Sequence, residues 1–94
     1  MNYTLFFPTP LNEINMECDN IDVFISLEIG QTYTLVAVTP DGLNELMKQT
    51  GKPFVEPGVP FCIVARLTEE NIRLFVEELL EDESLLKLYG SDLA

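Results

Sequence analysis

Residues 21–38 read IDVFISLEIGQTYTLVAV, and this stretch decides the fold. β-Branched and aromatic residues fill both of its halves, which favours two strands. Gly30-Gln31 between the halves is typical of a two-residue type II′ turn, whose twist suits antiparallel strands. Residues 21–29 and 32–39 are therefore predicted to form a hairpin in which Ile29 lies opposite Thr32 and Ile25 lies opposite Val36.

This register divides the hairpin into two faces. The face predicted to meet the core carries Val23, Ile25, Leu27, Val36 and Val38. The other face carries Phe24, Tyr33 and Leu35, and no helix is predicted above it. Because exposed apolar patches often mark interfaces, these three residues are predicted to form a homodimer interface. Residues 5–7 and the proline-rich loop at 51–60 are the alternative covers for this face.

Local signals place the next elements. Residues 2–7 alternate as a short strand, and residues 11–20 are polar and are predicted to be a loop. Thr39 is predicted to cap a helix that has Pro40 at its first position and ends at Gly51. Residues 61–67 are apolar on both faces, which favours a central strand.

The C-terminal third is helical in pattern. Thr68 is predicted to cap a helix whose apolar stripe is Ile72, Phe75, Val76, Leu79 and Leu80. A weaker apolar pattern continues to Tyr89, so residues 69–89 form either one helix or two helices with a break near Glu83. The predicted fold is one α+β domain over residues 1–94, a two-layer sandwich of order β-ββ-α-β-α. It has a mainly antiparallel sheet with helices on one face.

Composition excludes several function classes. The chain has 16 Asp and Glu, 5 Lys and Arg, and no histidine, which gives a net charge of -11. Histidine-based catalysis and histidine metal ligands are therefore excluded, and nucleic acid and anionic membranes are repelled. The carboxylates of residues 17–22 do not fit a calcium loop, and Gly51-Lys52 does not fit a phosphate-binding loop. We expect no enzyme activity, no cofactor and no metal.

The charge itself points to a partner. A small domain typically needs a net charge of about 2–8 in size for solubility, and this chain exceeds that range. The excess gathers in the predicted partner-binding residues Glu77, Glu78, Glu81, Asp82 and Glu83. They are predicted to attract a basic protein, so the chain is a protein–protein interaction module, inhibitor-like or antitoxin-like. The alternatives are a solvated surface without a partner and a self-associating structural or assembly protein.

The expected location is the cytoplasm. Cys18 and Cys62 are too few for the disulfide framework of a small secreted fold. No signal peptide is recognised at the N-terminus, and no run approaches 18 apolar residues.

Several short motifs occur in a characteristic order. They are Val38-Thr39-Pro40, Glu56-Pro57-Gly58-Val59-Pro60-Phe61, Ile63-Val64 and Leu67-Thr68-Glu69-Glu70-Asn71-Ile72. Over residues 21–80 this order resembles a group of short uncharacterised bacterial proteins. The resemblance implies a compact bacterial cytosolic domain, and it implies no catalytic or binding residues.

Overall fold

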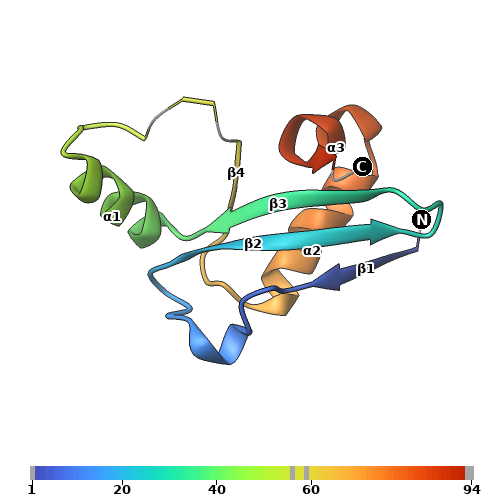
Figure 1. Cartoon of the computed structure of the whole chain (residues 1–94), viewed down its shortest axis with the longest axis horizontal. Coiled ribbons are helices and arrows are strands. Elements are labelled where there is room, and N and C mark those ends of the chain that lie inside the picture. The colour runs from blue at the N-terminus through green and yellow to red at the C-terminus, as the bar shows by residue number, and fades with distance from the viewer. Residues whose placement is uncertain (1, 56, 59, 93–94) are drawn as a thin grey trace.

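The computed structural model describes residues 2–55, 57–58 and 60–92, and it has the predicted α+β architecture (Figure 1). Strands β1, β2, β3 and β4 lie side by side in that order, and β5 also pairs with β3. All pairings are antiparallel except β3 with β4, which is parallel. The strands are β1 (Tyr3–Phe6), β2 (Asn20–Leu27), β3 (Thr32–Val38), β4 (Phe61–Ile63) and β5 (Ser91–Asp92).

The helices are α1 (Pro40–Thr50), α2 (Glu69–Leu80) and α3 (Glu83–Tyr89), with a short 3-10 turn at Leu11–Glu13. In Figure 1, α2 runs behind β2 and β3, while α1 projects from the end of β3. We call the sheet face toward α2 the inner face and the opposite face the outer face.

The hairpin is confirmed, but its predicted register was wrong. Ser26 lies opposite Thr32 and Phe24 lies opposite Thr34, which shifts the pairing by three residues. The loop spans residues 28–31 and is closed by a hydrogen bond from the Leu27 N–H to the Gln31 carbonyl. Gly30 provides the positive φ of 100° that this loop requires. A longer loop leaves Ile29 in solvent, where it is 70% exposed.

An odd shift exchanges the two faces of β3, because side chains alternate along a strand. Tyr33 and Leu35 are buried in the core, so their assignment to a dimer interface was wrong. Val36 was predicted in the core but lies half-buried on the outer face. Of the predicted interface residues, only Phe24 remains on that face.

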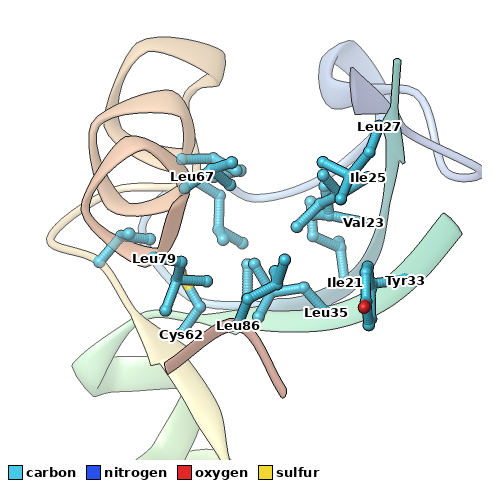
Figure 2. Close-up of a cluster of buried hydrophobic side chains, with 14 residues drawn as sticks. Ile21, Val23, Ile25, Leu27, Tyr33, Leu35, Cys62, Leu67, Leu79 and Leu86 are labelled. Atoms are coloured by element: carbon cyan, nitrogen blue, oxygen red, sulfur yellow. The ribbon is translucent and has the colours of Figure 1, made fainter. Parts of the chain in front are cut away.

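The core fills the space between the inner face and α2 (Figure 2). The sheet contributes Val23, Ile25 and Leu27 as predicted, and α2 and α3 contribute residues such as Val76 and Leu86. The core residues labelled in Figure 2 are Ile21, Val23, Ile25, Leu27, Tyr33, Leu35, Cys62, Leu67, Leu79 and Leu86.

Helix α1 begins and ends as predicted. The Thr39 hydroxyl accepts a hydrogen bond from the Gly42 N–H at 3.0 Å, and Gly51 ends the helix with φ 70°. Val38, on the outer-face side of β3, is fully buried and lies next to Gly42. Helix α1 therefore covers one end of the outer face and leaves the rest open.

Two further predictions are settled. Residues 61–67 were predicted to form a central strand, but β4 has three residues and lies at the sheet edge beyond β3. After Ile63 the chain turns so that Val64 and Leu67 are buried in the core. Residues 69–89 form two helices, because the chain leaves α2 at Glu81 and Asp82 caps α3.

Candidate protein-binding surfaces

The predicted partner-binding carboxylates lie at the exposed surface of α2 and of the turn that follows it. Helix α2 buries Ile72, Val76 and Leu79, and its 3.6-residue period leaves other positions in solvent. Glu77, Glu78, Glu81 and Asp82 are exposed, whereas the side chain of Glu83 lies outside the described part. The structure thus brings four of the five predicted residues to one exposed region.

Glu77 already has an intramolecular contact. The Tyr3 hydroxyl donates to Glu77 Oε1 at 3.4 Å, and the Arg73 guanidinium lies over the Tyr3 ring at 5.7 Å. Arg73 Nε also lies 3.5 Å from Glu69 Oε2, an ion pair between residues four positions apart on α2. Glu77 and Arg73 therefore link α2 to β1 at the molecular surface.

Asp82 also has a local role. Its Oδ1 accepts hydrogen bonds from the Ser84 N–H at 2.9 Å and the Ser84 hydroxyl at 2.6 Å. Both bonds lower the pKa of Asp82, and the bond from the Ser84 hydroxyl has the larger effect. The bond from the Ser84 N–H also caps α3.

Within the described chain, Glu70, Glu78 and Glu81 form no ion pair, and Leu74 lies among them with 58% of its surface exposed.

The outer sheet face is a second and more apolar surface. Phe6 on β1 lies opposite Phe24 on β2, and their ring centroids are 5.8 Å apart. Along the neighbouring row, Val36 lies opposite Phe61 of β4. Phe6 is 60% exposed and Ile63 is 54% exposed, while the other members are half-buried. We call Phe6, Phe24, Val36, Phe61 and Ile63 the outer apolar patch.

One carboxylate lies within this patch. Asp22 is exposed, lies directly opposite Val36, and precedes Phe24 by two residues on the same face of β2. None of the five lysines and arginines lies in a described strand. Asp22 forms no ion pair within the described part of the chain.

More carboxylates lie where β2 begins, beside α1. A hollow of about 300 Å³ there is lined by Asp19, Asn20, Glu45 and neighbouring residues. The pKa of the Cys18 thiol in this hollow is raised by desolvation and then by the charges of Glu45, Asp41 and Asp19. Lys48 is the nearby cation, and it is paired with Glu45 at 3.3 Å. The hollow is an acidic extension of the outer face.

The sequence pointed to some of these residues and missed others. In the alternating pattern of residues 2–7, Phe6 and Leu5 lie on opposite faces of the strand, so the sequence indicates that Phe6 faces away from the core. Phe61 and Ile63 were missed because a two-sided apolar run is also the pattern of a central strand. Asp22 was seen as one of several acidic residues, and only the register places it among aromatic side chains.

No family model, curated protein or solved structure matches this chain. No three His, Cys, Asp or Glu side chains among the described residues are grouped to hold one metal ion. No helix within residues 2–55, 57–58 and 60–92 has the length and apolar character to cross a bilayer.

Proposed function

We propose that this protein is a non-enzymatic interaction module that binds a basic protein in the cytoplasm, with the outer sheet face as its contact surface. The main support for the proposal is the outer apolar patch, in which the rings of Phe6 and Phe24 are in contact and over which none of the described helices lies (Figure 1). Exposed apolar groups of this kind, gathered on one rigid sheet, are typical of protein–protein contacts.

The charge of the chain supports a basic partner. An excess of 11 carboxylates over cations produces a negative potential that speeds association with a positive protein. The cytoplasmic location is supported by Cys18 and Cys62, which are both free thiols in the structure. We favour a specific form of this function, in which the protein is an inhibitor or antitoxin-like protein that covers the basic face of its target.

Self-association through the same patch is the second candidate. An apolar patch without a cation favours it, because two copies would remove Phe6 and Phe24 from water together. Charge opposes self-association, because each copy brings a net charge of -11 and an unpaired Asp22 within the patch. Sedimentation of the isolated protein separates the two: a monomer at high concentration favours the basic partner, and a dimer lost in Phe24→Asp favours self-association.

Capture from a lysate of the source organism tests the contact surface. Wild type, the double variant Phe6→Ser/Ile63→Ser and the control Leu88→Ser are immobilised, and retained proteins are identified by mass spectrometry. Leu88 is 63% exposed on α3, so its substitution removes a comparable apolar side chain from another surface. We expect a protein of high isoelectric point to be retained by wild type and Leu88→Ser and reduced about tenfold or more by the double variant. Equal retention by all three would contradict the proposal.

A further inference from the structure

We infer that the outer apolar patch receives an arginine side chain of the partner at Asp22. This inference rests on the proposed function and specifies the chemistry of the bound segment. Asp22 is a carboxylate that faces solvent, has no cationic partner within the described chain, and has Phe24 beside it. A cation placed there can pair with the Asp22 carboxylate and contact the Phe24 ring at the same time.

The position of Asp22 relative to the rings is fixed by the sheet. Asp22 and Phe24 are successive outward residues of β2, and such residues are separated by about 7 Å along a strand. Val36 and then Phe61 continue the row across β3 and β4. A side chain that reaches Asp22 therefore has the Phe6–Phe24 pair beside it along β2, and Val36 and Phe61 beside it across the strands.

These neighbours favour arginine over lysine. A guanidinium donates two hydrogen bonds to one carboxylate and stacks its flat face on an aromatic ring. An ammonium is a compact and strongly hydrated charge that loses more hydration on an apolar surface. Two of the neighbours of Asp22, Phe24 and Val36, are apolar, so the planar and weakly hydrated cation is the better match.

Charge complementarity also favours a basic segment over a second copy. The outer face carries Asp22, and the acidic hollow next to it carries Asp19 and Glu45. Asn20 lines this hollow and lies two residues from Asp22 on the same face of β2. In an extended partner segment, side chains on one face are also two residues apart, so cations at alternate positions would reach Asp22 and the hollow together. A second copy would instead bring further carboxylates to the same place.

The test uses the pentapeptide acetyl-Arg-Val-Arg-Val-Arg-amide and its lysine counterpart. Each is titrated into the ¹⁵N-labelled full chain at about 0.15 M salt, where charges beyond about 8 Å are screened. We expect shifts centred on Asp22, Phe24 and Val36, and weaker binding of the lysine peptide. Asp22→Asn should weaken the arginine peptide about fivefold, the effect of losing one exposed charge pair. Glu70→Gln, which removes one charge from α2, should change the affinity less than twofold.

Three results would overturn the inference: equal effects of Asp22→Asn and Glu70→Gln, equal affinity for both peptides, or shifts confined to α2. Concentration-dependent broadening of the outer-face signals without peptide would also overturn it, because a second copy would then be the occupant. The lysate capture separates this inference from the proposed function. If Phe6→Ser/Ile63→Ser loses the partner while Asp22→Asn retains it fully, the contact surface stands and the arginine site fails. If the arginine peptide binds at Asp22 but the double variant retains the partner, the proposed function fails.

Discussion

At the residue scale, Gly42 sets the distance between α1 and the sheet. A Cβ atom at this position would collide with the Asp19 carbonyl oxygen and meet the Val38 side chain at 3.0 Å. The Gly42 N–H also donates to the Thr39 hydroxyl, so the cap and the close approach occur at one residue. Helix propensity alone favours alanine here by about 1 kcal/mol, and the packing opposes it.

We therefore predict that Gly42→Ala destabilises the protein by about 1–3 kcal/mol, because the backbone of Asp19 cannot yield without moving β2. Asn44→Ala on the exposed side of the same helix is the control, and it should be neutral or slightly stabilising. Urea unfolding followed by circular dichroism measures both. A Gly42→Ala variant as stable as Asn44→Ala would show that α1 does not pack this closely.

The two thiols differ in their surroundings, and their reactivity should differ as well. Cys62 is fully buried, and burial raises its pKa from 9.0 to about 12, whereas Cys18 is half-buried at the surface. We predict that a disulfide reagent at pH 8 modifies one thiol in the folded protein and two in denaturant. Rapid modification of both thiols without denaturant would contradict the buried position of Cys62.

The same burial predicts a pH dependence of stability. The pKa of Cys62 is higher in the folded state than in the unfolded state, so its contribution is complete below about pH 9. That contribution is lost as the pH rises from 9 toward 12, because the unfolded chain releases the proton first. Cys62→Ala should therefore lose less stability than wild type between pH 8 and 10.5 in urea titrations. Parallel losses in both proteins would contradict the assignment.

At the scale of elements, the sequence predicted what local chemistry determines. The caps at Thr39 and Thr68 and the end of α1 at Gly51 need only a few neighbouring residues, and all three are confirmed. The register of β3 was missed because residues 35–38 are apolar on both faces, so alternation does not distinguish them. Gly30 marked the turn correctly, but its place within a four-residue loop depends on which side of β3 the helices bury.

The exchanged faces of β3 yield a direct comparison of neighbouring residues. Leu35 is fully buried against the helices, so Leu35→Ala should cost about 2–5 kcal/mol. Val36 lies half-buried on the outer face, and Val36→Ala should cost about 1 kcal/mol or less. Thermal and urea unfolding of the two variants checks the register. A larger loss of stability for Val36→Ala than for Leu35→Ala would support the register that the sequence predicted, with a two-residue turn and Val36 in the core.

At the scale of the whole molecule, the acidic helix and the apolar patch lie on opposite layers. The shortest dimension of the molecule is 21 Å, whereas exposed charges are screened beyond about 8 Å at physiological salt. The carboxylates of α2 therefore act on a partner at the outer face mainly at low salt, where the screening length reaches about 30 Å. Under physiological conditions, Asp22 and the acidic hollow are the charges near the proposed contact.

This geometry predicts a salt-dependent role for α2. Glu78→Gln/Glu81→Gln should leave folding intact and slow association with the captured partner at about 10 mM salt. At about 150 mM salt, the same variant should associate at nearly the wild-type rate. Stopped-flow or surface-based kinetics at the two salt concentrations measures the effect. A large loss of affinity at both concentrations would place the contact on α2 itself.

Hydroxyl-radical footprinting of side chains, with and without the captured partner, distinguishes a contact on the outer sheet face from a contact on the helices. Phe6 and Ile63 are more than half exposed in the free protein, and so are Leu74 on α2 and Leu88 on α3. We predict that the partner protects Phe6 and Ile63 from oxidation and leaves Leu74 and Leu88 as reactive as before. Protection of Leu74 and Leu88 with unchanged oxidation of Phe6 and Ile63 would contradict a contact at the outer sheet face.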